Sequence, residues 1–332
     1  MKTILITGGA GYVGSTLLRV LLRNGYRVVC FDKLLFGGES LLDIWNEQNF
    51  VFIKGDVTDF GLIKEVLTNH KIDAVVHLAA IVGDPACKRE PGVATRTNWE
   101  ASKSLLEQCI ENNVRRFIFA STCSNYGKMS DPNVLLKETS PLLPVSLYAE
   151  LKVRFENYLV TGIRKIDNFA PTSLRFATVY GLSPRMRFDL TVNEFTKEIA
   201  SGRELVVYGE HFWRPYCHVA DFSRAIMHVL EAPEELVAYN VFNVGDTKEN
   251  YTKKMIVDEI IRQIPAAKVK YIHKDEDPRD YRVSFDKINQ SLGFKISRTV
   301  PDGIKEVKDV IQLGVICDPE AQRFYNIQHA VK

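Results

Sequence analysis

The segment TILITGGAGYVGSTLL, residues 3–18, constrains the fold more than any other part of the chain. A strand-like run, Thr3–Thr7, leads directly into a glycine-rich turn, and a helical pattern follows. Gly8 permits a tight turn, Gly11 lets a ligand approach the backbone, and Gly14 lets the helix pack close to the strand. Free N–H groups and the helix dipole then face an anion, so the segment predicts a pyrophosphate site. The expected contacts are Gly8, Gly11, Tyr12, Val13 and Gly14.

Short apolar runs alternate with amphipathic helical patterns through the first half of the chain. Strands are expected at Thr3–Thr7, Arg27–Phe31, Val51–Lys54, Ala74–Leu78, Arg116–Ala120 and Thr172–Phe176. Helices are expected near 13–24, 59–69, 98–112 and 146–161. This alternation predicts an α/β fold, a doubly wound parallel sheet with helices on both faces.

The rhythm weakens after about residue 178, where prolines interrupt the pattern. A helix near 219–231 and a strand at Tyr239–Val244 still fit the sheet. We therefore expect a sheet domain of residues 1–178 plus about 216–246. A smaller lobe is expected from about 179–215 plus 247–332.

The composition excludes several classes of protein. Of 332 residues, 45% are apolar and 25% charged, and the net charge of +2 gives no general attraction to nucleic acid or membranes. No apolar run is long enough to span a membrane, and the first strand leaves no room for a signal peptide. Six scattered cysteines form no CxxC pair and no Cys/His cluster, so we expect no metal, no disulfide framework and a cytoplasmic location.

The second strand ends at Asp32, 18 residues after Gly14. An acid about 20 residues beyond such a turn hydrogen-bonds the adenosine ribose of a dinucleotide. Its charge repels a 2′-phosphate, which favours NAD over NADP, although the adjacent Lys33 could soften that preference. The alternative is that Asp32 is an ordinary residue at a strand end.

Two later strand ends fit the same cofactor. Asp56 and Val57 follow the third strand, where an acid can meet adenine and an apolar side chain can pack on its face. Leu78, Ala79 and Ala80 end the fourth strand, and small side chains let a dinucleotide cross a strand end. Simple packing between helix and sheet would explain the alanine pair equally well.

A possible catalytic pair lies in the YAELK segment. Tyr148 and Lys152 are four residues apart, so they share one helix face. A neighbouring ammonium, and a cationic nicotinamide, would lower the pKa of the phenol and let Tyr148 act as a general base. Hydroxyls at the end of the preceding strand, Ser121, Thr122 and Ser124, could hydrogen-bond a substrate alcohol. The alternative is a surface tyrosine beside a solvated lysine.

Together these motifs resemble the extended short-chain dehydrogenase/reductases of the nucleotide-sugar epimerase/dehydratase family. The matching segments are TGGAGYVG (7–14), Asp32, Asp56-Val57, HLAA (77–80), Asn98, STCSNYG (121–127), YAELK (148–152), LRFATVYG (174–181) and RPYCHVAD (214–221). The resemblance implies a Rossmann-type fold, NAD as cofactor, and a homodimer formed through the helices near 98–112 and 146–161. It makes Tyr148 the base, Lys152 the residue that lowers its pKa and holds the nicotinamide ribose, and Thr122 the hydroxyl partner.

The resemblance also implies a nucleotide-diphosphate sugar as substrate. The residues expected to contact it are Asp84, Thr122, Ser124, Thr178, Asn193, Val206, Arg214 and Arg279. Arg214 and Arg279 are suited to bind a diphosphate bidentately. Simpler alternatives are a surface ion pair for each arginine and an Asp-Pro turn for Asp84.

The departures from the family narrow the expected reaction. Its 4,6-dehydratases place acidic residues after the catalytic threonine, whereas this chain has Cys123 and Ser124. We therefore expect oxidoreduction at C4 of the sugar, with 4-epimerisation through a 4-keto intermediate favoured. A net 4-dehydrogenase or 4-ketoreductase is the first alternative, and a non-catalytic NAD- or nucleotide-sugar-binding regulator the second.

Overall fold

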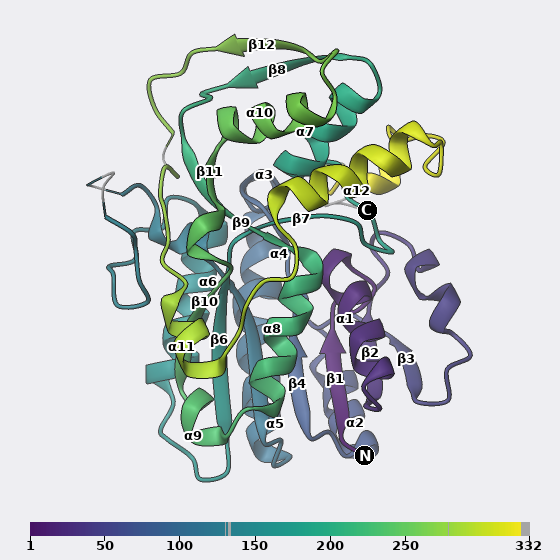
Figure 1. The fold of residues 1–332 in the computed structure, drawn as a ribbon. Coiled ribbons are helices and arrows are strands. Elements are labelled where there is room, and N and C mark those ends of the chain that lie inside the picture. Colours follow the sequence, from purple (N-terminus) through teal and green to yellow (C-terminus); the bar gives the residue numbers. More distant parts are fainter. Residues whose placement is uncertain (130, 132–133, 278, 327–332) are drawn as a thin grey trace.

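A seven-stranded parallel sheet forms the centre of the computed structural model, which describes residues 1–129, 131, 134–277 and 279–326 (Figure 1). Its strands are β1 (Thr3–Thr7), β2 (Arg27–Asp32), β3 (Phe50–Lys54), β4 (Ala74–His77), β5 (Arg116–Thr122), β6 (Ala170–Phe176) and β10 (Asn240–Val244). They follow the order β10-β6-β5-β4-β1-β2-β3. The strand order therefore reverses between the neighbouring strands β1 and β4. Parallel sheets of this kind bind ligands at such a reversal of strand order.

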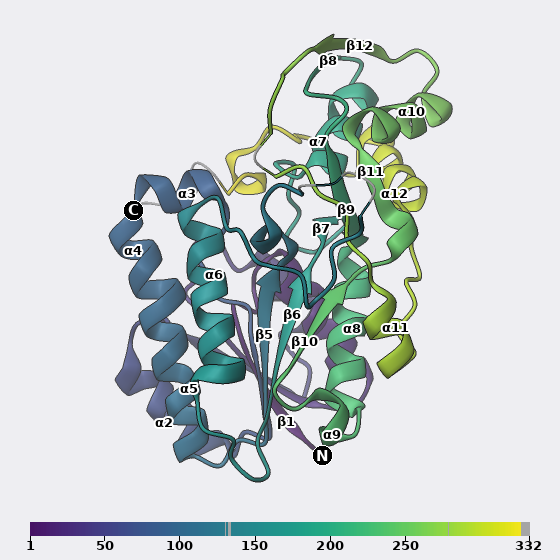
Figure 2. The ribbon, with the colours of Figure 1, turned by 90° about the vertical axis from the view of Figure 1, so that its left-hand side faces the viewer.

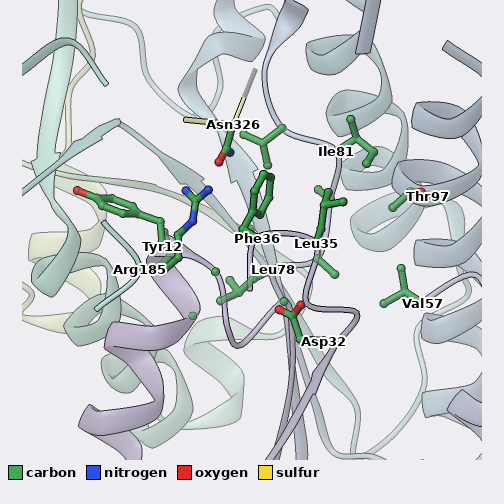
Figure 3. Close-up of a pocket in the computed structure, with 18 of the residues that line it drawn as sticks. Tyr12, Asp32, Leu35, Phe36, Val57, Leu78, Ile81, Thr97, Arg185 and Asn326 are labelled. Carbon is green, nitrogen blue, oxygen red and sulfur yellow. The ribbon is translucent and has the colours of Figure 1, made fainter. Parts of the chain in front are cut away.

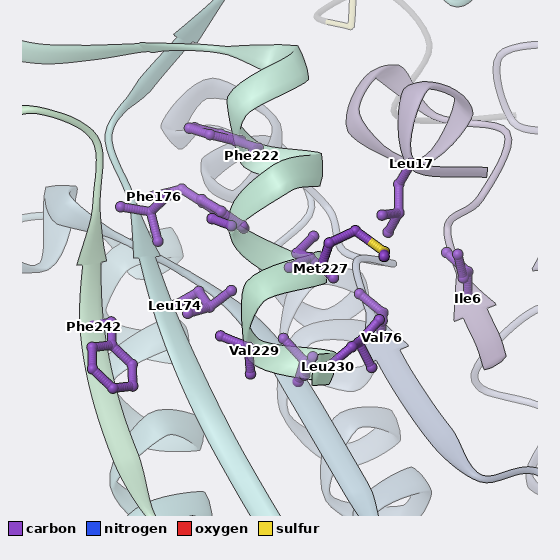
Figure 4. Close-up of a cluster of buried hydrophobic side chains, with 14 of the residues drawn as sticks. Ile6, Leu17, Val76, Leu174, Phe176, Phe222, Met227, Val229, Leu230 and Phe242 are labelled. Atoms are coloured by element: carbon purple, nitrogen blue, oxygen red, sulfur yellow. The ribbon is translucent and has the colours of Figure 1, made fainter. Parts of the chain in front are cut away.

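Helices cover both faces of this sheet (Figures 1 and 2). One face carries α1 (Tyr12–Arg23) and α8 (Val219–Glu231), and the other carries α2 (Phe60–His70), α5 (Ser102–Glu111) and α6 (Leu147–Asn157). Leu17 of α1 and Phe222 of α8 pack on the first face with Leu174 of β6 (Figure 4). On the second face, Phe155 of α6 packs on Phe117 and Phe119 of β5. The predicted doubly wound α/β sheet is confirmed.

Two of the expected helices each contain a π-helical turn. The stretch near 98–112 consists of a π-helical turn, η2 (Arg96–Ala101), followed by α5, and α6 ends in a second one, η4 (Tyr158–Gly162). The shorter segments around the sheet are η1 (Glu39–Ile44), α3 (Asp84–Arg89), α4 (Pro91–Thr95), η3 (Cys123–Tyr126) and α9 (Glu234–Val237). Among the described residues no helix combines the length and apolarity needed to cross a membrane.

A smaller lobe lies beyond the carboxyl ends of the sheet strands (Figure 1). Its strands form a three-stranded sheet, β11-β9-β7, and a two-stranded sheet, β12-β8. These strands are β7 (Thr178–Tyr180), β8 (Glu204–Tyr208), β9 (Trp213–His218), β11 (Asn250–Thr252) and β12 (Lys268–Ile272). The remaining segments are α7 (Thr191–Ala200), η5 (Thr247–Glu249), α10 (Lys253–Gln263), α11 (Asp286–Leu292), α12 (Val300–Gln312) and η6 (Gln322–Phe324). Of these, α11 returns to pack beside β10 of the large sheet.

Candidate active site

A cavity of about 270 Å³ lies where the carboxyl ends of the large sheet meet the smaller lobe. All of the residues predicted to contact a dinucleotide line it: Gly8, Gly11, Tyr12, Val13, Gly14, Asp32, Lys33, Asp56, Val57, Leu78, Ala79, Ala80, Ser121, Tyr148 and Lys152. Thr122 lines the same cavity. The fold thus joins the glycine turn, the strand ends and the Tyr148–Lys152 pair into one site. Figure 3 shows Tyr12, Asp32 and Leu78 on the wall of this cavity.

The glycine turn has the shape that a phosphate-binding turn requires. Gly8 adopts φ +75°, and a Cβ there would lie 2.8 Å from the backbone nitrogen of Ala79. A Cβ at Gly14 would lie within 3 Å of the carbonyl oxygen of Gly8, so α1 could not pack against the turn. Gly11 begins the helix without a side-chain cap, which leaves N–H groups of the first turn for an anion.

Asp32 is held in place by two backbone N–H groups. Its carboxylate accepts hydrogen bonds from Ala10 (3.0 Å) and Leu34 (2.7 Å). Burial raises the pKa of this carboxyl, and the two hydrogen bonds oppose that shift. Lys33 also lines the cavity and pairs with Asp56 at 3.2 Å. The cation that could have accommodated a 2′-phosphate is therefore engaged by another carboxylate.

Lys152 is buried and fixed behind Tyr148 on α6. Its Nζ donates to the carbonyl oxygen of Ala120 at 2.7 Å and lies 5.9 Å from the centroid of the Tyr148 ring. Burial lowers the pKa of Lys152 to about 8. Burial also raises the pKa of Tyr148, with Cys87 and Asp84 adding to the rise and Arg187 opposing it. The protein groups around Tyr148 thus favour the protonated phenol, and added positive charge is needed to make Tyr148 a base.

The hydroxyls at the end of β5 hold different partners. Thr122 Oγ1 accepts from the backbone N–H of Ser124 at 3.1 Å, which leaves its own proton for a ligand. Ser121 accepts a hydrogen bond from Asn125. Ser124 is hydrogen-bonded to Tyr281, a buried side chain of the smaller lobe. Ser121 and Thr122 both line the cavity, and because each accepts its hydrogen bond, each keeps its own proton to donate.

The charged residues predicted to contact the substrate all form ion pairs in the structure. Asp84 accepts a hydrogen bond from Ser146, the N-cap of α6, at 2.6 Å and pairs with Arg279 at 3.1 Å. Arg214 pairs with Asp277 at 2.8 Å and lies 5.4 Å from the Tyr281 ring centroid. Each of the two arginines therefore already has a carboxylate partner in the structure.

The other predicted substrate residues lie elsewhere. Asn193 is fully buried, accepts from the Gly181 N–H, and donates to the Arg187 carbonyl and the Tyr12 hydroxyl. It joins the smaller lobe to α1. Val206 lies on β8, where its side chain is 37% exposed, and Thr178 begins β7. Of the eight predicted substrate residues, Thr122 alone lines the cavity in the described part of the chain.

Arg185 and Asn326 line the cavity but escaped the sequence prediction. Arg185 is 6% exposed, its Nε and one Nη have no hydrogen-bond partner among the described residues, and its guanidinium stacks 4.2 Å from the Phe36 ring (Figure 3). Asn326 likewise has a buried Oδ1 without a partner in the described ranges. Unpartnered buried polar atoms are rare, and these face a cavity lined by a phosphate-binding turn. A dinucleotide, with its phosphates and ribose hydroxyls, fits these donors and acceptors.

The C-terminal segment Asp318–Asn326 brings Asn326 to the cavity. Lys197 of α7 donates to Glu320 and to the Tyr325 hydroxyl, both at 2.8 Å. The backbone N–H of Asn326 donates to Asp189, which also forms a bidentate pair with Arg187. The Arg-Met-Arg sequence at 185–187 could have indicated that Arg185 and Arg187 bind an anion, but nothing in the sequence pointed to Asn326.

A Rossmann-type sheet with this cavity defines a dinucleotide-dependent enzyme of the short-chain dehydrogenase/reductase type. The model of the NAD dependent epimerase/dehydratase family matches residues 4–245. The chain belongs to that family and is an NAD-dependent enzyme.

Relatives in this family catalyse different reactions. The chain is 31% identical to a dTDP-glucose 4,6-dehydratase of Streptomyces niveus, covering 91% of this chain and 90% of the relative. It is 26% identical to a UDP-glucose 4-epimerase of Halalkalibacterium halodurans, covering 88% and 90%.

Solved structures agree on the fold. A UDP-glucose 4-epimerase of Thermotoga maritima, with UDP-glucose, is 27% identical with a TM-score of 0.82, covering 94% of this chain and 99% of that one. A UDP-glucuronic acid 4-epimerase of Bacillus cereus, in complex with UDP-glucuronic acid and NAD, is 25% identical with a TM-score of 0.83 and the same coverage.

Proposed function

We propose that this enzyme performs NAD-dependent oxidoreduction at C4 of a nucleotide-diphosphate sugar, with 4-epimerisation through a 4-keto intermediate as the outcome. One observation carries the proposal: Tyr148, Lys152 and Thr122 line the same cavity as the glycine turn. A proton acceptor, a buried cation and a hydroxyl donor thereby lie beside the expected place of the cofactor.

In this mechanism each residue has a defined task. Thr122 donates a hydrogen bond to the C4 hydroxyl, and Tyr148 takes the proton from that hydroxyl as the hydride leaves. Bound NAD supplies the hydride acceptor and a positive charge close to Tyr148. That charge opposes the effect of burial, and Lys152, fixed on the Ala120 carbonyl, keeps the phenolate next to a cation. Tyr148 would return the proton to the C4 oxygen when the 4-keto intermediate is reduced on its opposite face.

Arg214 and Arg279 are proposed to bind the substrate diphosphate. Each would exchange its carboxylate partner, Asp277 or Asp84, for phosphate oxygens. Asp84 would then be released close to Tyr148, where it can accept from sugar hydroxyls. Guanidinium groups bind phosphate bidentately, so the exchange preserves strong charge-assisted hydrogen bonds.

Two observations favour epimerisation over the other outcomes. Thr122 is followed by Cys123 and Ser124, and these are engaged with the Arg175 carbonyl and with Tyr281, so neither supplies the acid–base pair that dehydration needs. Arg185 and Asn326 are proposed to contact the cofactor and retain it, which suits a reaction without net oxidation. Net dehydrogenation or ketoreduction, the alternative, requires the cofactor to exchange at every turnover.

The test supplies candidate nucleotide-sugars to the purified enzyme without added cofactor. A 4-epimer formed without change in NADH absorbance is the expected result. Net formation of NADH, or a keto-sugar as the final product, would assign dehydrogenation, and a 4-keto-6-deoxy-sugar would assign dehydration. Either result would overturn the proposal of epimerisation.

We propose a homodimer formed through α5 and α6 with their π-helical turns. Within one chain the two segments are in contact, because the Arg154 guanidinium lies 3.9 Å from the Trp99 ring centroid and Trp99 packs edge-on against Tyr158. Size-exclusion chromatography with light scattering tests the dimer, and a monomer at micromolar concentration would refute it.

We also propose that the chain divides into two lobes at about residue 178, with residues 216–246 returning to the sheet domain.

A further inference from the structure

A cluster of imidazoles and carboxylates lies at the far end of the smaller lobe, outside the active site. Strands β8 and β12 run parallel and end together at Tyr208 and Ile272. Glu210, His211 and His273 follow these ends, and each offers one ligand atom within 4.8 Å of the other two. The two imidazole rings lie nearly parallel, with centroids 5.3 Å apart.

The backbone on both sides of this cluster is fixed. The Gly209 N–H donates to the Ile272 carbonyl at 3.1 Å and ties one loop to the other. The Glu210 carbonyl accepts from the N–H of Lys254 at 2.8 Å, and Phe212 is buried against Gly209. Only side-chain torsions are therefore needed to change the distances between the three ligand groups.

The charges of the cluster favour a cation. Glu210 Oε2 is shielded from solvent and has no hydrogen-bond partner among the described residues, which is costly for a carboxylate oxygen. Asp275 lies 3.3 Å from His273 Nε2 and offers a fourth oxygen. The neighbouring lysines are engaged at Tyr208, where Lys253 donates to the carbonyl and Lys274 lies over the ring.

We propose that Glu210, His211 and His273 bind a divalent transition metal ion of the Zn²⁺ class, with Asp275 or water as the fourth ligand. Zinc takes imidazole and carboxylate ligands at about 2.0–2.2 Å, which places tetrahedral ligand atoms about 3.3 Å apart. The three groups therefore need to approach one another by only about 1–1.5 Å from the observed limit. The sequence spacing hides this site because the second histidine comes from a different loop.

Metal binding at this place would connect two segments of the proposed substrate site. His211 precedes Arg214 by three residues, and His273 precedes Asp277 by four. A metal shared by both loops would hold these segments together independently of the Arg214–Asp277 ion pair. Metal binding would thus restrict the motion of the two loops on the proposed substrate side of the smaller lobe.

The test titrates Zn²⁺ into the full chain, free of any polyhistidine tag, by isothermal calorimetry after treatment with a chelator. We expect one saturable site per chain and a higher melting temperature with Zn²⁺. His211→Ala and His273→Ala should each weaken binding at least tenfold, and the double variant should abolish it. The imidazoles of both are exposed, so these variants should fold normally.

His70→Ala is the matched control, because this histidine lies on α2, far from the cluster, and its loss should leave zinc binding unchanged. Absence of saturable binding by the parent chain would overturn the proposal. So would equal binding by the parent and the double variant. The NAD content of the same samples reports separately on the active site, so failure at one site cannot be mistaken for failure at the other.

Discussion

The cofactor side and the substrate side of the active site hold their polar groups differently. On the cofactor side, Arg185 and Asn326 point buried, unpartnered atoms into the cavity. On the side that we propose binds the substrate, Arg214 and Arg279 are already paired with carboxylates. One side is prepared for its ligand, whereas the other must exchange partners, so we expect the first to supply affinity and the second to supply selectivity.

The two ion pairs on the substrate side also differ from each other. The Arg279 and Asp84 side chains are 42% and 31% exposed, whereas those of Arg214 and Asp277 are 12% and 15% exposed. An exposed pair contributes only about 0–1 kcal/mol, so Arg279 can change partners at little cost. The more buried Arg214 pair is the stronger barrier to exchange and should discriminate more strongly between ligands.

The largest effect is expected from Tyr148→Phe. Loss of the phenol removes the proposed general base, which typically contributes about 10²–10⁴-fold, while the NAD content of the purified protein should be unchanged. Turnover of a nucleotide-sugar and bound NAD, measured on one sample, check this prediction. Activity close to that of the parent would show that the catalytic assignment is wrong.

Lys152→Met should abolish activity and at the same time raise the free energy of unfolding. Because burial lowers the pKa of Lys152 from 10.5 to about 8, the charged form is less stable in the folded state, by up to about 3 kcal/mol. That cost applies fully below about pH 8 and disappears as the pH rises toward 10.5, so the parent should gain stability over this range.

The lost hydrogen bond to Ala120 offsets about 1 kcal/mol of the gain. In denaturant unfolding at pH 7 without NAD, the variant should therefore be more stable by about 2 kcal/mol and inactive. A variant less stable than the parent at pH 7 would mean that burial of the ammonium is fully compensated by its contacts.

Arg214→Leu should raise KM about tenfold to a hundredfold, because hydrogen bonds to charged groups contribute about 1.5–3 kcal/mol. Asp277→Asn is the matched variant: it frees the guanidinium from its carboxylate and should lower KM. Steady-state kinetics with the preferred nucleotide-sugar measures both. If the two substitutions raise KM equally, substrate binding requires the intact Arg214–Asp277 ion pair, which would contradict the proposed exchange of Asp277 for phosphate.

The smallest effect is expected from Asn326→Ala. One neutral hydrogen bond contributes about 1 kcal/mol, so NAD should dissociate about fivefold faster. Asn240→Ala, at the start of the edge strand β10, is the matched control. NAD release measured by fluorescence tests the retention proposal, and equal rates for the parent and Asn326→Ala would contradict it.

The cofactor side could be predicted from the sequence because its signals are local. A strand, a glycine turn and Asp32 lie within one βαβ unit, and period-two and helical patterns place the remaining strand ends on the same edge. Tyr148 and Lys152 are likewise joined by helical spacing. Each of these residues lies in the cavity.

The rest depends on contacts that no local pattern encodes. Asn326 reaches the cavity only because Lys197 and Asp189 hold the C-terminal segment. Asn193 is of a residue type that often contacts ligands. Its side-chain amide, however, is hydrogen-bonded to Gly181, Arg187 and Tyr12. The raised pKa of Tyr148 also could not be predicted, because it depends on burial and not on the spacing of Lys152.

The wall of the cofactor cavity is built from both extremes of the described chain, with Gly8 near one end and Asn326 at the other. During synthesis on a ribosome, the glycine turn emerges more than 300 residues before Asn326. A nascent chain can therefore form the turn early, but it can enclose the dinucleotide only after the segment carrying Asn326 has left the exit tunnel.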